Sequence, residues 1–201
     1  MNRQNENWEE RYRTGDTPWD KGATAPPLIE YLEQHALGGR VLVPGCGLGH
    51  DARYLAQHAD QVIGLDISAT AIDRAKQFPQ PDNLHFQTAD FFNLPSSFHG
   101  SFDFIFEHTF LCALQPERRT DYVQIAHQLL KPGGRLIAIF YTVIDGSSAV
   151  AEGPPFSISP AEIDALFEYA FSTRAAWHPK RQFASRCNGE EQMRVLQRHS
   201  D

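Results

Sequence analysis

Apolar and polar positions alternate along the chain in blocks that predict a repeated order of strands and helices. Short continuous apolar runs are typical of buried parallel strands, and apolar residues recurring at helical spacing are typical of amphipathic helices. Apolar runs predict strands over 40–44, 62–66, 102–106 and 135–141; a third short strand is predicted over 84–88, and two weaker strands near 172–177 and 192–197. The helical spacing predicts helices over 24–37, 50–58, 68–77, 115–130 and 160–169, with 131–134 (Lys-Pro-Gly-Gly) stopping the fourth.

This alternation predicts an α/β fold, with one mainly parallel sheet of about seven strands and helices on both faces. No internal repeat or low-complexity linker interrupts the pattern, so residues 1–201 are expected to form one domain. Ligands of such sheets bind outside the carboxyl ends of the strands. The residues that follow each predicted strand are therefore the candidates for a functional site.

The first predicted strand enters a glycine-rich turn, and the second ends at an acid. Gly45, Gly47 and Gly49 allow a tight turn and a close approach of the backbone to a ligand. Asp66 follows Gly45 by 21 residues, where a carboxylate accepts hydrogen bonds from both ribose hydroxyls. His50 replaces the third glycine of a dinucleotide fingerprint, and the turn lacks a P-loop lysine. The turn therefore favours S-adenosylmethionine over NAD or ATP, and the alternative is a purely structural turn.

Composition and charge argue against several classes of protein. The chain of 201 residues carries a net charge of −7, which argues against a nucleic-acid or anionic membrane partner. The start of the chain is polar, and no apolar run approaches the roughly 20 residues of a membrane span, so we expect a cytoplasmic protein. Cys46, Cys112 and Cys187 are widely spaced and indicate neither a disulfide framework nor a metal site, and Cys46 is interpreted as a small turn residue rather than a nucleophile. The sequence leaves the oligomeric state open, and a monomer is plausible.

Further candidates follow the third, fourth and fifth strands. Asp90 and Phe91 offer a carboxylate for an adenine amino group and an aromatic ring to stack on it. The segment 107–112 contains His108, whose imidazole titrates near neutrality, so it is either a general base or an ordinary polar neighbour of the cofactor. An Asn/Asp-Pro-Pro-Tyr/Phe turn, which serves amino-group methylation of bases, does not follow the fourth strand. This difference argues further against a nucleic-acid methyltransferase.

Six short motifs follow one another in a specific order. They are W-x-x-x-Y-x-x-G-x-T-P-W-D from Trp8, V-P-G-C-G-x-G-x-D from Val43, G-L-D-I-S from Gly64, D-F-F from Asp90, K-P-G-G from Lys131 and G-P-P-F from Gly153. In this order they resemble the thiopurine S-methyltransferase family, and within it the thiol, halide and thiocyanate methyltransferases. The resemblance runs from about residue 8 to residue 156 and implies a class I, Rossmann-like methyltransferase fold dependent on S-adenosylmethionine.

The resemblance also implies roles for single residues. It implies that residues 1–23 form an arm that closes as a lid over the cofactor. The implied cofactor contacts are Trp8, Tyr12, Trp19, Gly45, Gly47, Asp66, Asp90, Phe91 and Glu107. The implied acceptor pocket contains Phe110, Tyr141 and Phe156, and the candidate catalytic residues are His108 and Arg186. In plant relatives the position of His108 is often aromatic, so this departure bears on the acceptor more than on the cofactor.

The implied reaction is methyl transfer from S-adenosylmethionine to a small soft nucleophile, namely a thiol, hydrosulfide, halide, thiocyanate or thiopurine. An acceptor that arrives ionised needs no general base; halides are always ionised, and thiols with a pKa near 8.5 are ionised in part. Another small acceptor, such as a metalloid oxyanion or an oxygen or nitrogen group, is one alternative. The others are a protein that binds S-adenosylmethionine without transferring its methyl group and a nucleotide-dependent enzyme or oxidoreductase on the same fold.

Overall fold

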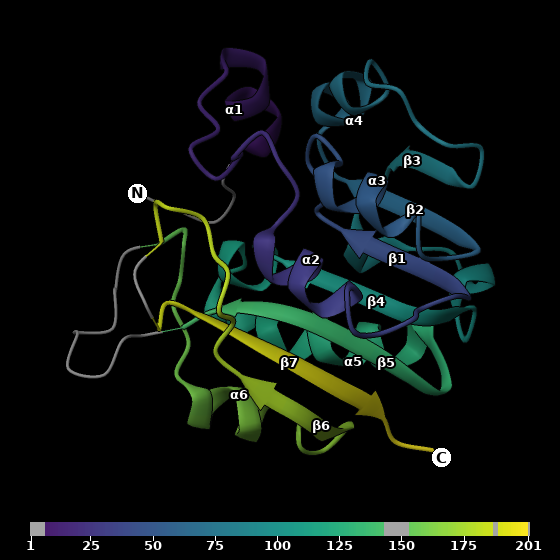
Figure 1. The fold of residues 1–201 in the computed structure, drawn as a ribbon, viewed down its shortest axis with the longest axis vertical. Helices are drawn as coiled ribbons and strands as arrows, with labels where there is room; N and C mark the ends of the chain where they lie inside the picture. The colour runs from purple at the N-terminus through teal and green to yellow at the C-terminus, as the bar shows by residue number, and fades with distance from the viewer. Residues whose placement is uncertain (1–6, 143–152, 187–188, 201) are drawn as a thin grey trace.

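A seven-stranded sheet forms the centre of the protein (Figure 1). The structure is a computed structural model that describes residues 7–142, 153–186 and 189–200. The strand order is β3-β2-β1-β4-β5-β7-β6; β1 to β5 are parallel, and β7 runs antiparallel to both neighbours. The strands are β1 (Arg40–Pro44), β2 (Gln61–Asp66), β3 (Leu84–Thr88), β4 (Phe102–His108), β5 (Leu130–Tyr141), β6 (Phe171–Trp177) and β7 (Glu191–Arg198). The predicted mainly parallel sheet is confirmed.

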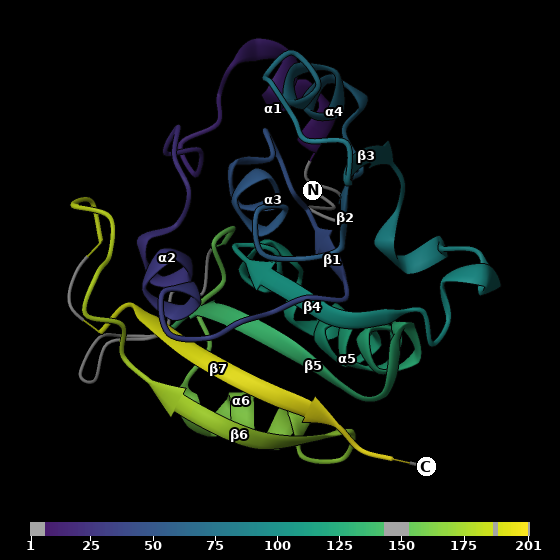
Figure 2. The ribbon, with the colours of Figure 1, turned by 45° about the vertical axis from the view of Figure 1, so that its right-hand side comes forward.

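Helices cover both faces of the sheet (Figures 1 and 2). One face packs against α2 (Pro26–Leu32), α3 (His50–Leu55) and α4 (Ala69–Ala75), and the other against α5 (Arg119–Leu129) and α6 (Pro160–Phe167). All five predicted helices are present, and each is shorter than predicted. The prediction over 24–37 ran past the end of α2 because Leu37, beyond that end, also packs against the core and continues the apolar pattern.

The predicted stop between the fourth helix and the fifth strand needs correction. Residues 131–134 lie inside β5, where the register shifts: Phe102 pairs with Leu130, but Phe104 pairs with Arg135. Gly133 has φ +74°, so it turns the backbone as a glycine can and most residues cannot. The Lys-Pro-Gly-Gly segment is therefore an irregularity within a strand rather than a loop before one.

The N-terminal arm contains a helix, α1 (Trp8–Thr14), that the apolar pattern does not predict. Local polar signals specify it instead: the Asn7 side chain accepts the N–H of Glu10, and Gly15 ends the helix at φ +80°. Figures 1 and 2 both show α1 beside α4. The Glu9 carboxylate joins the two helices, because it accepts hydrogen bonds from the Ser68 and Thr70 hydroxyls. Residues 1–6 of the predicted arm lie outside the described residues.

Candidate active site

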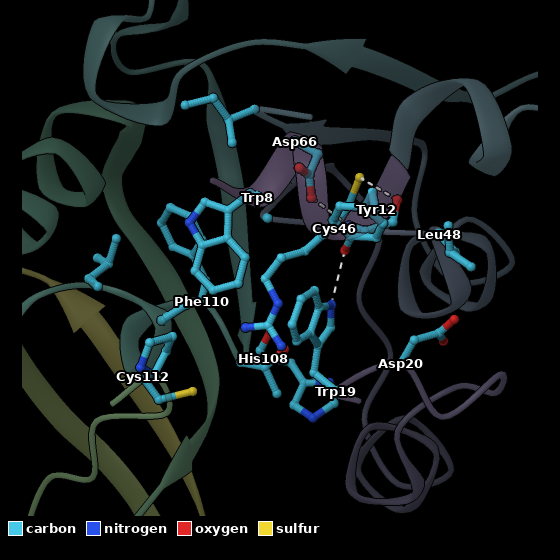
Figure 3. A pocket seen from close by; sticks show the side chains of 18 of the residues that line it. Trp8, Tyr12, Trp19, Asp20, Cys46, Leu48, Asp66, His108, Phe110 and Cys112 are labelled. Carbon is cyan, nitrogen blue, oxygen red and sulfur yellow. Dashed lines mark hydrogen bonds between the residues drawn. The ribbon is translucent and has the colours of Figure 1, made fainter. Parts of the chain in front are cut away.

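A cavity of about 880 Å³ lies between the N-terminal arm, the glycine turn and the segment after β4 (Figure 3). Its size is in the usual range for a small-molecule site, roughly 300–1,000 Å³. Most of the predicted site residues line it: Trp8, Tyr12, Trp19, Gly45, Gly47, Asp66, Asp90, Phe91, His108, Phe110 and Arg186. Glu107, Tyr141 and Phe156 are not on its wall. The structure thus brings together residues that are up to 178 positions apart in sequence, from Trp8 to Arg186.

The glycine turn after β1 is the place where the arm and the β4 segment meet. Gly45 and Gly47 have φ +58° and +52°. A Cβ at Gly45 would lie 2.5 Å from Cδ2 of Phe110, and a Cβ at Gly47 would lie 2.7 Å from the Tyr12 hydroxyl. Glycine is therefore required at both positions for two reasons. The backbone has a conformation that residues with a Cβ rarely adopt, and a Cβ would lie too close to a neighbouring side chain.

Asp66 at the end of β2 holds the glycine turn in place through hydrogen bonds. Its two carboxylate oxygens accept the N–H groups of Gly47 and Ser68, each at 2.9 Å. Burial raises the pKa of Asp66, the nearby Glu9 carboxylate adds to the rise, and the two N–H donors oppose it. Two acids close together at one end of the cavity favour a ligand that carries positive charge.

The aromatic side chains of the arm form a closed cluster over the turn. The Trp19 ring makes edge contacts with Trp8 and Tyr12 at centroid distances of 5.2 and 5.8 Å. The Trp19 indole N–H donates to the Tyr12 hydroxyl at 3.1 Å, as the dashed line in Figure 3 shows. The Arg11 guanidinium lies 4.4 Å from the Trp19 ring centroid. Tyr12 is only 5% exposed and is the buried centre of this cluster, whereas Trp8 and Trp19 are half-buried.

The adenine candidates after β3 have different surroundings. Asp90 is exposed, and its carboxylate accepts the Phe92 N–H at 2.9 Å. Phe91 is largely buried and packs on Phe110 at 5.4 Å. Phe92 is half-buried on the cavity wall with the Arg118 guanidinium 4.0 Å from its ring centroid. The Phe92–Arg118 pair is thus a second aromatic surface that the sequence interpretation missed.

His108, at the end of β4, contacts an acid from α3. Its Nδ1 lies 2.8 Å from the Asp51 carboxylate, whose other oxygen accepts the Ala25 N–H at 2.7 Å. Burial opposes the charged imidazole, but Asp51 together with Glu191 and Glu107 raises the pKa of His108. The next residue, Thr109, has φ +61°, a backbone conformation that residues other than glycine rarely adopt. This turn directs Phe110 onto Gly45.

Arg186 reaches the cavity from the connection between β6 and β7. Its Nε donates to the Glu191 carboxylate at 3.1 Å, and its guanidinium lies 5.1 Å from the Tyr141 ring centroid. Glu191 is 2% exposed. Tyr141 therefore packs against Arg186 without lining the cavity itself. The Arg186 guanidinium and the His108 imidazole both belong to residues of the cavity wall.

Glu107 lies behind the wall, buried under the segment that follows its strand. One carboxylate oxygen accepts the N–H groups of Phe110 and Leu111 at 2.9 and 2.8 Å. Burial raises the pKa of Glu107 to about 7, against the effect of these two donors. The contacts suit a residue that shapes the Phe110 turn, and a cofactor contact of Glu107 stays a prediction.

The raised pKa of Glu107 predicts a pH-dependent stability. Because the folded pKa of about 7 lies above the reference value of 4.5, the folded chain holds a proton that the unfolded chain loses, so stability falls as pH rises from about 4.5 through 7. Glu107→Gln keeps a neutral acceptor for both N–H groups. We expect this variant to be more stable than the unsubstituted protein by on the order of 3 kcal/mol at pH 8, with less than about 1 kcal/mol of difference at pH 5. Denaturant unfolding at the two pH values measures this.

Glu168→Gln, a change at an exposed acid beyond α6, is the matched control and should show no such pH dependence. An equal difference between Glu107→Gln and the unsubstituted protein at both pH values would contradict the prediction.

Phe156 also lies away from the wall, and its backbone holds the preceding prolines in place. Its N–H donates to the Cys112 carbonyl at 2.7 Å, and its own carbonyl accepts from Arg119 at 2.9 Å. Pro154 and Pro155 of the same motif do line the cavity. The G-P-P-F motif thus contributes to the wall through its prolines rather than through its aromatic ring.

Sequence reasoning missed several residues of the wall. They are Asp51, Arg118 and Phe183, while Cys112 belongs to the segment 107–112 already named as a candidate. Asp51 had a visible signal, because it ends the V-P-G-C-G-x-G-x-D motif, whereas Phe183 had none. Burial raises the pKa of the Cys112 thiol to about 12, so this thiol is held protonated. Within the described ranges no group of three or more His, Cys, Asp or Glu side chains could hold a metal ion, and no helix is both long and apolar enough to cross a membrane.

The arrangement fits S-adenosylmethionine on three counts. The two glycines leave room where a side chain would collide with Phe110 or Tyr12, Asp66 stands at the end of a strand where a carboxylate can hold ribose hydroxyls, and Asp66 with the nearby Glu9 suits a cationic sulfonium compound. Trp8, Tyr12 and Trp19 are placed to shield such a ligand from water.

Comparisons with known proteins give a consistent result. The sequence profile of the thiopurine S-methyltransferase family matches residues 3–199. The chain is 39% identical over 162 residues to a probable thiol methyltransferase 2 of Arabidopsis thaliana, covering 78% of this chain and 69% of that protein. It is 36% identical over 157 residues to thiocyanate methyltransferase 1 of Brassica oleracea, covering 76% and 67%.

A solved structure supports the fold. The 1,6-didemethyltoxoflavin N1-methyltransferase of Burkholderia thailandensis, crystallised with S-adenosylhomocysteine, superposes with a TM-score of 0.75 at 17% identity, covering 95% of this chain and 85% of that one. The predicted class I methyltransferase fold is thereby confirmed.

Proposed function

Because this chain belongs to the thiopurine S-methyltransferase family and is a methyltransferase dependent on S-adenosylmethionine, we propose that it methylates small soft nucleophiles, with thiols, hydrosulfide, iodide and thiocyanate as the acceptors. The resemblance stated from the six motifs is confirmed by the family match. Nucleic acids and protein amino groups are not among the proposed acceptors.

One observation carries this proposal: a single cavity joins a cofactor side to an acceptor side of opposite character. Asp66 and the glycine turn form the first side, near the acid Glu9. His108, Arg186 and the ring of Phe110 form the second, which offers polarisable rings and basic groups. A small anion or polarisable sulfur fits the second side, because a cation attracts the former and aromatic rings contact the latter favourably.

The cofactor supplies a methyl group activated by a sulfonium charge. The chain's part is to bind and orient. Asp66 and the glycine turn fix the donor end, Arg186 attracts an anionic acceptor, and Phe110 with the prolines at 154 and 155 limits where the acceptor lies. Good alignment of two reactants lowers a barrier by roughly 7–11 kcal/mol in favourable cases. The aromatic arm excludes water, which stabilises separated charges better than the dispersed charge of this transition state.

An acceptor panel tests the proposed function. With labelled S-adenosylmethionine we expect methylated product from hydrosulfide, small thiols, iodide and thiocyanate, and none from DNA, RNA or a lysine-rich protein. Thiopurines, selenite and tellurite complete the panel, since other acceptors of this kind would revise the substrate class. The proposal is wrong if an amine or a carboxylate is methylated efficiently while thiols and halides are inert.

Calorimetry separates the remaining classes of protein. We expect binding of S-adenosylmethionine and S-adenosylhomocysteine and no binding of NAD or ATP. Tight cofactor binding without turnover of any acceptor would favour a protein that binds the cofactor without transferring its methyl group.

A further inference from the structure

Asp51 lines the cavity, yet the reaction described above assigns it no part. Both of its carboxylate oxygens are engaged, one by the Ala25 N–H at 2.7 Å and the other by His108 Nδ1 at 2.8 Å. The side chains of Asp51 and His108 are only 17% and 14% exposed. A shielded carboxylate held at both oxygens has little freedom to rotate, so it fixes the orientation of the imidazole.

This contact also fixes which nitrogen of His108 is basic. An ionised carboxylate only accepts hydrogen bonds, so Nδ1 must be the nitrogen that carries the proton. In the neutral imidazole the lone pair then lies on Nε2. Within the part of the chain that the structure describes, no hydrogen bond engages Nε2. The basic atom is thus left available on a residue of the cavity wall.

The charged groups around the imidazole favour proton uptake. Asp51 faces it from α3, Glu107 lies on its own strand, and Glu191 faces it from β7. The cation Arg186 also faces the cavity but is paired with Glu191. Three acids against one paired cation raise the pKa of His108, although burial opposes this.

We propose that Asp51 and His108 form a proton-accepting pair that extends the methyl transfer to acceptors arriving in protonated form, namely alkanethiols and hydrogen sulfide. This inference rests on the proposed function. Here His108 is the catalytic residue, since Nε2 takes the proton, and Asp51 is a positioning residue that sets the tautomer and stabilises the imidazolium.

The step is balanced as follows. The S–H proton of the acceptor moves to Nε2, and the sulfur electron pair forms the new bond to the methyl carbon. The electron pair of the broken methyl–sulfur bond stays on the sulfur of the donor, which leaves as neutral S-adenosylhomocysteine. The imidazolium later releases the proton to solvent.

The acceptor determines how much this pair contributes. A halide has no proton to give and gains nothing from a base. A thiol whose pKa lies well above the working pH is almost entirely protonated, so it gains most. General-base catalysis contributes typically about 10²–10⁴-fold.

The test compares Asp51→Asn with the unsubstituted protein on three acceptors at pH 7: an alkanethiol of high pKa, an aryl thiol of low pKa and iodide. The carboxamide of Asn donates to Nδ1 and so shifts the imidazole proton to Nε2. We expect kcat/KM to fall about 10²-fold for the alkanethiol and less than about threefold for the aryl thiol and iodide. The alkanethiol rate should recover as the pH passes the pKa of the thiol.

Asp73→Asn is the matched control, because Asp73 is exposed on α4 and does not line the cavity. Calorimetry with S-adenosylmethionine checks that each variant still binds the cofactor. If Asp51→Asn does not bind S-adenosylmethionine, His108→Gln is compared with the unsubstituted protein on the same three acceptors instead.

Equal losses on all three acceptors, or an unchanged alkanethiol rate, would overturn the proposal. The proposed function fails separately, if the unsubstituted protein methylates none of the three acceptors.

Discussion

Removal of residues 1–19 is expected to abolish methyl transfer while the seven-stranded sheet still folds. The sheet and both helical layers are built from residue 26 onward, so the truncated chain keeps the core. It loses the aromatic cluster of Trp8, Tyr12 and Trp19, and with it the wall that closes the cavity over the glycine turn. An exposed site no longer excludes water or aligns its reactants, and we expect kcat/KM to fall by about 10²-fold or more. Circular dichroism checks the fold, and turnover of a thiol and of iodide checks the activity.

Two milder variants test whether the N-terminal arm closes over a bound cofactor or is only attached to the rest of the protein. Tyr12→Phe removes the hydroxyl that accepts the Trp19 N–H, and Glu9→Gln weakens the link between the arm and α4. Hydrogen exchange across residues 8–19, measured with and without S-adenosylmethionine, tests whether the cofactor orders the arm. Identical exchange in the two states would mean that the arm is a fixed wall rather than a lid.

Asp66→Ala is expected to weaken cofactor binding by about 1.5–3 kcal/mol, a loss of roughly 10- to 150-fold in affinity. In the proposed cofactor site this carboxylate accepts from the ribose hydroxyls, and in the structure it holds the N–H groups of Gly47 and Ser68 at 2.9 Å. Its removal therefore loses direct contacts and loosens the turn that must lie close to the ligand. Calorimetry with S-adenosylhomocysteine measures the loss.

Asp66→Asn distinguishes these two contributions. The amide keeps one oxygen as an acceptor, so we expect an affinity between that of the unsubstituted protein and that of the Ala variant. Asp60→Asn, which changes an acid that holds the Gly39 N–H just before β2 begins and so at the opposite end of that strand from Asp66, controls for a general loss of turn geometry. Unchanged affinity in Asp66→Ala would remove Asp66 from the cofactor site.

The sequence predicted the sheet well and indicated most of the residues around the glycine turn that line the cavity, because both follow from local patterns. Four mainly apolar runs and the alternating segment Leu84–Thr88 specify the parallel strands, and the spacing from Gly45 to Asp66 is set by one strand–helix–strand unit. The helix predicted over 68–77 follows this unit, and Ser68 at its start accepts the Ala71 N–H as a helix-capping serine does. Each of these features depends on neighbours close in the chain.

The acceptor half was harder to predict because its contacts join distant segments. No local pattern shows that Asp51 meets His108 or that Arg186 is supported by Glu191 and Tyr141. Glu107 and Phe156 look like site residues by position, yet their side chains or backbones hold neighbouring turns instead of lining the cavity. Which side of a strand end faces the ligand depends on turns such as that at Thr109, and the sequence does not reveal a positive φ there.

The two halves of the cavity come from different parts of the chain, and this division bears on how substrate preference evolves. The proposed donor side is built from segments before residue 92 and His108 and Phe110 come from the end of β4 and the turn after it, whereas Pro154, Pro155, Phe183 and Arg186 come from the connections after β5 and between β6 and β7. β6 is an edge strand that pairs only with β7. Insertions or exchanges in these connections leave the glycine turn untouched. A chimaera that carries the C-terminal third of a relative therefore exchanges the Arg186 part of the proposed acceptor side, while His108, Phe110 and the glycine turn stay unchanged.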